Sequence, residues 1–159
     1  MRITIVCVGK IKESFYREAL AEYAKRLSKY CKFEVIEVAD EKTPDGASDT
    51  VCEQIMRKEG DKISSKIPDN AYVIATAIEG KKYDSVKFAN MIERLTVDGN
   101  SHIVFIIGGS LGIHPDIKAR ANALISFSDM TFPHQLMRVI LSEQIYRAYR
   151  IITGEPYHK

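Results

Sequence analysis

The segment Thr131–Lys159 reads TFPHQLMRVILSEQIYRAYRIITGEPYHK and contains the longest near-continuous apolar helix pattern of the chain. A Pro-His pair precedes this pattern, and a Gly-Glu-Pro break and an aromatic, basic tail follow it. Chain termini are often disordered, but this one is too apolar and too clearly punctuated for disorder. We expect it to close a ligand pocket, to form a subunit interface and to carry residues that face a substrate.

Apolar residues occupy two sides of the helix that this segment predicts from His134 to Ile152. One set forms a stripe along the helix: Met137, Leu141, Ile145, Ala148 and Ile152. Three more apolar residues lie on another side: Val139, Tyr146 and Tyr149. One stripe is enough to dock a helix on its own sheet. The second patch favours a second copy of the chain as partner, and the alternative is a helix buried within one large core.

The chain upstream of this helix alternates between strand and helix patterns. Short apolar or alternating runs predict five strands: Arg2–Val8, Lys32–Val38, Ala71–Ala77, His102–Ile107 and Ala123–Phe127. Amphipathic patterns predict helices at Ser14–Tyr30, from Thr50 to Ile63, at Ser85–Leu95 and from Pro115 onward. This order predicts an α/β fold with a mostly parallel, five- or six-stranded sheet and helices on both faces. We expect the most apolar strand, His102–Ile107, at the centre and the more polar Lys32–Val38 toward an edge.

Three connections carry specific expectations. Thr50–Glu53 has the pattern of a capping box at a helix start, and Ile78–Lys81 has the composition of a turn after the third strand. Ala39–Asp49 is rich in charged residues and contains both proline and glycine, so it predicts a flexible loop. This loop is either a solvated connector or a lid that contacts a substrate.

The composition is ordinary for a single globular domain spanning residues 1–159. Hydrophobic residues make up 45% and charged residues 28%, and the net charge is +2, so RNA binding would need a local basic patch. The three cysteines and four histidines show no metal-ligand spacing, so we expect reduced thiols and no metal site. The apolar run Ile3–Val8 is too short for a signal peptide or a membrane span, which predicts a cytoplasmic protein without membrane association.

Three strand ends offer positions for a ligand, because open α/β sheets bind ligands beyond the carboxyl ends of their strands. They are Thr76–Lys81, Gly108–Gly112 and Phe127–Pro133. The glycines of the second position lack Cβ atoms and allow a ligand to approach the backbone closely. Their spacing, G-G-x-x-G, is not that of a dinucleotide site, and Ser110 is not in a G-x-S-x-G elbow. A tight turn without a ligand is the alternative interpretation.

Four motifs together resemble one known family. They are Phe105–Gly112, Thr131–Leu136, Ser142–Ala148 and Pro156–His158, in the same order over essentially the whole chain. The family is the bacterial ribosomal RNA large subunit methyltransferase H, of the SPOUT class. The resemblance implies an α/β fold with a C-terminal trefoil knot and a homodimer. It also implies S-adenosylmethionine as cofactor, and as substrate N3 of a pseudouridine in 23S rRNA of the assembled ribosome.

The site residues follow by matching position, together with the glycines of the fourth strand end. The expected cofactor pocket comprises Thr76, Gly108, Gly109, Gly112, Phe127, Ser128, Asp129, Met130, Thr131 and Phe132. The candidate catalytic residues are His158 and Tyr157, with Arg147 or Lys159 as electrostatic partner. They would help the N3 proton to leave or stabilise the anionic base. The alternatives are a tail that only grips rRNA phosphate and a non-catalytic ribosome-binding factor on the same fold.

Two positions depart from the family pattern. Thr76-Ala77 stands where the family often has Leu-Asp, which puts a role for that carboxylate in doubt. Lys159 ends the chain where the family commonly has arginine. The positive charge is kept, but the fork geometry of a guanidinium is lost.

Overall fold

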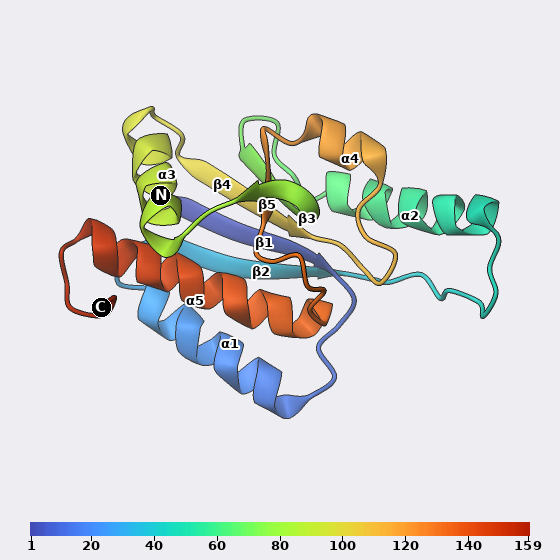
Figure 1. The fold of residues 1–159 in the computed structure, drawn as a ribbon, viewed down its shortest axis with the longest axis horizontal. Helices are drawn as coiled ribbons and strands as arrows, with labels where there is room; N and C mark the ends of the chain where they lie inside the picture. The colour runs from blue at the N-terminus through green and yellow to red at the C-terminus, as the bar shows by residue number, and fades with distance from the viewer.

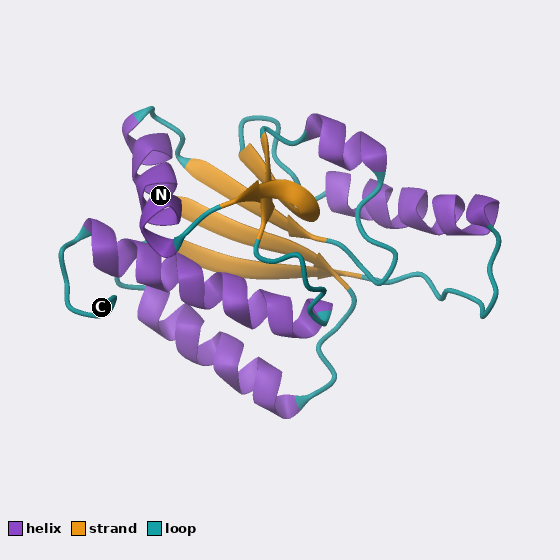
Figure 2. Cartoon of the chain, in the orientation of Figure 1, coloured by secondary structure: helices purple, strands orange, loops and turns teal.

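Five strands and five helices alternate along the chain in the computed structural model, which describes residues 1–159 (Figures 1 and 2). The strands are β1 (Arg2–Val8), β2 (Lys32–Val38), β3 (Tyr72–Lys82), β4 (His102–Ile107) and β5 (Ala123–Ser126). The helices are α1 (Ser14–Leu27), α2 (Asp49–Ser64), α3 (Ser85–Val97), α4 (Pro115–Arg120) and α5 (His134–Ile152). The predicted α/β fold is confirmed.

All strand pairs in the sheet are parallel, and the strand order is β2-β1-β4-β3-β5. The apolar β4 lies at the centre and the more polar β2 at an edge, as predicted. Every residue of β4 after His102 is buried, whereas most of β2 is only half-buried or exposed. A central parallel strand is covered on both faces, which explains its continuous apolar run.

Helices cover both faces of the sheet, which confirms that prediction (Figure 1). Helices α1, α3 and α5 pack on one face, and α2 and α4 pack on the other. Successive strand residues alternate between the two cores, because side chains along a strand point to opposite faces. Ile5 of β1 belongs to the core under α1, α3 and α5, and its neighbour Val6 belongs to the core under α2 and α4.

Helix α5 contradicts the prediction of two separate apolar patches. Tyr146 and Tyr149 are buried in the same core as the stripe from Met137 to Ala148. Their rings contact α1 and the residues after it, with Tyr149 stacked on Tyr30 at a centroid distance of 5.4 Å. The alternative of one large core is therefore correct for these tyrosines, and they give no support to a dimer.

Two connections also differ from prediction. Helix α2 begins at Asp49 because the Ser48 hydroxyl, not Thr50, accepts the Val51 N–H at 3.3 Å. The predicted turn at Ile78–Lys81 is instead a continuation of β3 with a bulge between Thr76 and Lys81. A Cβ on Gly80 would lie 2.5 Å from the backbone of β5, so glycine here permits close approach of two strands and does not mark a turn.

The loop between β2 and α2 is fixed at its first residues. Lys62 of α2 donates to the carbonyl of Ala39 at 3.0 Å and to the carboxylate of Glu41 at 2.7 Å. The Glu41 N–H donates to the buried carboxylate of Glu59 at 3.1 Å.

None of the helices combines the length and apolar character needed to cross a membrane. The trefoil knot stays a prediction.

Candidate functional site

A cavity of about 250 Å³ opens at the carboxyl edge of the sheet, where β3, β4 and β5 give way to loops. Nine of the ten residues predicted for a cofactor pocket line it: Thr76, Gly108, Gly109, Gly112, Phe127, Ser128, Met130, Thr131 and Phe132. The tenth, Asp129, does not line the cavity and forms an ion pair with Lys82. The structure therefore brings together three loops that are far apart in the sequence.

The glycines of the loop after β4, Gly108–Gly112, allow the tight turn that lines this cavity. A Cβ on Gly108 would lie 2.7 Å from the carbonyl carbon of Gly112 and 2.7 Å from Ile113 Cγ1. Gly112 has φ +89°, a conformation that side chains rarely allow. Gly109 and Gly112 pair with each other as a short bridge. The predicted tight turn is therefore present, and its three glycines line the cavity at the end of β4.

The loop after β5, Phe127–Pro133, is stabilised by hydrogen bonds of serine hydroxyl groups. Ser126 Oγ donates to the carbonyl of Ser128 at 3.1 Å, and Ser128 Oγ accepts the Met130 N–H at 2.9 Å. Such local bonds favour one shape of the loop, and the ion pair between Asp129 and Lys82 ties it to β3. The loop thereby presents Phe127 and Phe132 as apolar walls, while the Met130 side chain is 76% exposed at the rim.

His134 lines the same cavity and was not among the predicted site residues. Burial, with the nearby positive charge of Arg138, lowers the pKa of His134 below its usual value. The ring is therefore neutral at neutral pH. Its place directly after the Phe127–Pro133 loop is a usable sequence signal for a residue of this cavity. Glu79 and Lys118 also line the cavity and pair with each other, and no sequence signal connects them.

Arg138 fixes the start of α5 to the ends of the first two strands. It is the largest fully buried side chain. Its guanidinium donates to the carbonyls of Val8 at 2.7 Å and Gly9 at 2.9 Å, and to the carboxylate of Glu37 at 3.1 Å. A buried charge is tolerated when it is paired and hydrogen-bonded in this way. These contacts tie the first turns of α5 to the ends of β1 and β2, beside the cavity.

The three candidate catalytic residues lie together at the other end of α5. Tyr157 Oη donates to Glu143 Oε1 at 3.1 Å, and Arg147 Nε donates to the same oxygen at 3.0 Å. The Arg147 guanidinium lies 4.7 Å from the centre of the Tyr157 ring, and its Nη1 is 3.3 Å from His158 Nδ1. Glu143 is the common partner of this group and was not among the predicted site residues.

The chemistry of the tail follows from these contacts. Burial, with the nearby Glu143 carboxylate, raises the pKa of Tyr157 to about 12, so its phenol keeps the proton at neutral pH. A guanidinium can only donate, so His158 Nδ1 accepts from Arg147. A neutral His158 then carries its proton on Nε2. In this arrangement the Tyr157 hydroxyl donates to Glu143, and the Nε2–H of His158 is a free hydrogen-bond donor.

His158 lines a second cavity, of about 520 Å³, and not the first. The two cavities share Ile125, Ser126, Phe127 and Phe132 in their walls. The second cavity also reaches Gln144 of α5, which accepts a hydrogen bond from the Ser85 hydroxyl at 2.9 Å. Within one chain, the tail and the predicted cofactor pocket therefore lie on either side of a common wall.

Comparison with known proteins adds the family. Residues 1–158 match the family model described as "Predicted SPOUT methyltransferase". The chain belongs to the SPOUT methyltransferase family. It is 60% identical to the "Ribosomal RNA large subunit methyltransferase H" of Bifidobacterium adolescentis, over 159 residues and the full length of both chains. It is 58% identical, with the same coverage, to the proteins of that name from Streptococcus uberis and Clostridium beijerinckii.

The recognised family and the predicted fold class thus agree with the comparisons. Nowhere in the chain do three or more His, Cys, Asp or Glu side chains form a group that could hold a metal ion. The cysteines Cys7, Cys31 and Cys52 are all unpaired thiols. What remains for this SPOUT methyltransferase is to assign its methyl donor, its acceptor and the residues that serve each.

Proposed function

We propose that this protein transfers a methyl group from S-adenosylmethionine to N3 of a pseudouridine in large-subunit rRNA, on the assembled ribosome. One observation carries the proposal: the cavity at the carboxyl edge is built from the loops that the family resemblance assigns to the cofactor. The full-length relatives are named as methyltransferases of large-subunit ribosomal RNA. Such a substrate would place the enzyme in the cytoplasm.

The residues of the cavity fit an adenosine-bearing cofactor. Phe127, Phe132 and Ile107 offer apolar walls to a planar ring, and hydroxyl groups of Ser128 and Thr131 are available for a ribose. Gly108 provides a backbone surface that a Cβ would obstruct. The bound cofactor would supply an activated methyl group, so the protein chiefly has to position the acceptor and exclude water.

The tail is suited to stabilise charge on the acceptor. Pseudouridine N3 carries a proton that must leave, here to solvent water, and negative charge then develops on the carbonyl oxygens of the ring until N3 takes the methyl group from the sulfonium. Arg147 and the Nε2–H of His158 are donors that can stabilise such an oxyanion, which favours an electrostatic role over a base role. Tyr157 stays protonated and fixes Arg147 through Glu143 and ring contact.

The direct test offers methyl-labelled S-adenosylmethionine with assembled ribosomes, isolated large subunits and naked rRNA in parallel. We expect label in the rRNA of assembled ribosomes and its recovery as N3-methylpseudouridine after digestion. The rival function, a non-catalytic ribosome-binding factor, predicts ribosome binding without label in any of the three. Calorimetry with S-adenosylmethionine separates the two independently, because a binding factor has no need of the cofactor.

His158→Ala at saturating ribosome tests the role of the tail. A catalytic or charge-stabilising role predicts a turnover lower by about 10²-fold, comparable to the loss of one donor from an oxyanion site. A tail that only grips phosphate predicts unchanged turnover with weaker ribosome binding. His158→Gln keeps a donor at this position, so it should retain more activity than His158→Ala if donation from the ring is what matters.

We further propose a homodimer, on the family resemblance alone. Sedimentation velocity tests the assembly. Mixing a Gly108→Val variant with a His158→Ala variant then asks which subunit supplies the tail. Recovery of activity in the mixture would mean that the tail of one subunit serves the cavity of the other. Without recovery, the tail would have to act across the wall formed by Phe127 and Phe132 in its own chain.

A further inference from the structure

The segment that joins α5 to the tail is a built structure and not a simple break. Gly154, with φ +66°, donates its N–H to the carbonyl of Ile151 at 3.1 Å, and Glu155 donates its N–H to the carbonyl of Arg150 at 2.9 Å. These two bonds define a Schellman motif, which ends a helix in one geometry. The direction in which the tail leaves α5 is therefore fixed first by the backbone.

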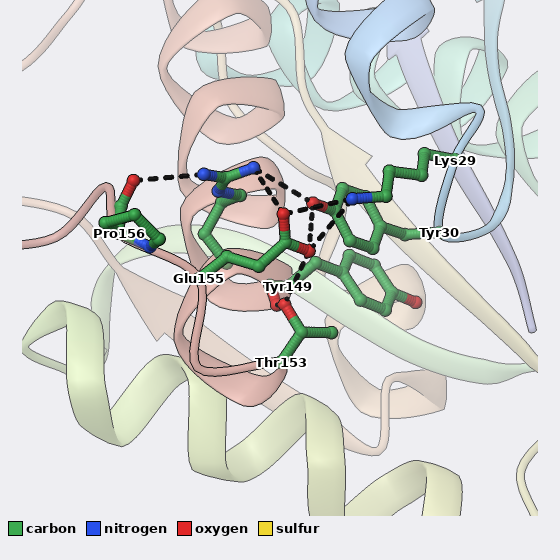
Figure 3. Close-up of polar contacts among 7 residues, drawn as sticks. Lys29, Tyr30, Tyr149, Thr153, Glu155 and Pro156 are labelled. Carbon is green, nitrogen blue, oxygen red and sulfur yellow. Dashed lines mark hydrogen bonds and ion pairs between the residues drawn. The ribbon is translucent and has the colours of Figure 1, made fainter.

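Glu155 adds a second set of contacts to this motif (Figure 3). A Schellman motif usually has an apolar contact between the positions that Glu155 and Arg150 occupy here. Instead, the two form an ion pair at 2.7 Å, with both side chains half-buried. Arg150 also donates to the carbonyl of Pro156 at 3.0 Å, so it holds the next residue of the tail as well.

The same carboxylate connects the tail to the end of the α1 region. Lys29 donates to it at 3.0 Å, Tyr30 Oη at 2.8 Å and the Thr153 hydroxyl at 3.0 Å. Figure 3 shows Lys29 and Tyr30 reaching the Glu155 carboxylate from one side and Thr153 reaching it from below. Tyr30 is itself stacked on Tyr149, so the contact rests on a packed aromatic pair. These donors lower the pKa of Glu155 to about 2, with the bond from Lys29 as the largest cause.

These contacts have a clear consequence for the residues that follow. Only one residue, Pro156, separates Glu155 from Tyr157, and its ring restricts the backbone. Tyr157 and His158 then fold back on α5, where they meet Glu143 and Arg147. Beyond His158 the tail has no further anchor, since Lys159 is exposed and takes part in no ion pair or side-chain hydrogen bond.

We propose that Glu155 is a positioning residue for methyl transfer: through Lys29, Tyr30, Arg150 and Thr153 it holds the tail so that Tyr157 and His158 face the acceptor base. Glu155 acts only through the tail and touches neither cofactor nor base. This inference rests on the proposed function, because it assumes that the tail serves the reaction.

The test is a double-mutant cycle between Glu155→Ala and a chain that ends at Pro156. In the full-length chain, Glu155→Ala should lower turnover on ribosomes about tenfold or more, since small misplacements of reacting groups are costly. Its affinity for S-adenosylmethionine should not change. In the shortened chain, the same substitution should cause no further loss. A purely structural role predicts the same fold-loss in both backgrounds and would overturn the proposal.

Two further measurements keep the test decisive if the shortened chain is inactive. The same double-mutant cycle can be measured with ribosome affinity as the readout, which does not require an active enzyme. Backbone ¹⁵N relaxation at Tyr157 and His158 should show a rigid tail in the wild type and a mobile one in Glu155→Ala. Equal rigidity in both would overturn the proposal. Asp98→Ala is the matched control, because Asp98 is an exposed carboxylate that pairs with only one arginine, Arg94 at 3.7 Å.

The design separates this inference from the function on which it rests. If wild-type protein labels no ribosomal RNA, the proposed function fails. If wild-type protein is active and Glu155→Ala retains both its turnover and a rigid tail, only the role of Glu155 fails.

Discussion

The cavity at the carboxyl edge and the tail after α5 are held by opposite means. The cavity loops keep their shape through glycine backbone, apolar walls and short hydroxyl bonds. The tail keeps its shape through charged side chains that meet on Glu143 and Glu155. Shape in the first region therefore depends on volume and backbone conformation, whereas shape in the second depends on charge added to the backbone turn at Gly154.

The pKa values of two glutamates show this contrast between the cavity and the tail. Glu59 lies under the cavity loop, with its carboxylate 3.0 Å from where a Cβ of Gly109 would be, and burial raises its pKa. Glu155 lies among donors in the tail, and they lower its pKa to about 2. The same side chain thus meets desolvation in one region and positive charge in the other.

Arg138→Met should have the largest effect on stability. Arg138 is an exception to the contrast between the two regions, because it is a charged side chain that fixes the cavity region. It is a charge at the cavity edge, but its main partners are backbone carbonyls. Methionine keeps the apolar stem and leaves the carbonyls of Val8 and Gly9 buried without a donor. We expect the free energy of unfolding to fall by about 3 kcal/mol, measured by urea denaturation. A loss no larger than that of Arg150→Met in the tail would contradict a difference between the regions.

Gly108→Ala tests whether cavity shape depends on volume. The added methyl would meet Gly112 and Ile113 at 2.7 Å, where neither backbone nor packed side chain can yield cheaply. We expect a loss of about 1–3 kcal/mol in stability and a larger loss of S-adenosylmethionine affinity by calorimetry. Gly46→Ala gives the opposite case, backbone strain without a steric clash: Gly46 has a positive φ, +66°, which Gly108 does not have, and nothing lies within 4 Å of its added Cβ. Tail rigidity should be unchanged in both.

Most of the fold was predictable because it depends on local periodicity. The burial of β4 and the exposure of β2 follow from the residues of each strand itself. The errors share one cause, a partner distant in the sequence. Gly80 continues a strand because β5 lies against it, and Tyr149 is buried because Tyr30 stacks on it. Neither contact leaves a pattern near the residue that it governs.

The candidate site was also predictable only in part, for the same reason. The cavity residues were predictable because strand ends converge in a parallel sheet and because the family motifs fall on them. The pair Glu79 and Lys118 was not, since the two residues are on different elements and 39 positions apart. The role of Glu155 was also missed, because G-E-P suggests only a helix end. Its carboxylate gains meaning from Lys29 and Tyr30, which lie more than a hundred residues earlier.

The smallest expected effects are those of Glu59→Gln and Glu155→Gln, and they should run in opposite directions with pH. A carboxyl whose folded-state pKa is raised contributes stability below its unfolded value of 4.5, and this contribution is lost as pH rises. Glu59→Gln should therefore stabilise the protein at pH 8, on the order of 1 kcal/mol, and have no effect near pH 4. Glutamine keeps the acceptor for the Glu41 N–H, so the comparison isolates the charge.

Glu155 has a lowered pKa, so its contribution is present above 4.5 and is lost as pH falls toward 2. Glu155→Gln should therefore destabilise the protein at pH 7, and the difference should fade between about pH 4.5 and 2 as Lys29, Tyr30 and Arg150 lose their anionic partner. Melting temperatures of both variants and wild type across this range provide the measurement. Parallel pH curves for the two variants would mean that the cavity and the tail are not held by different forces.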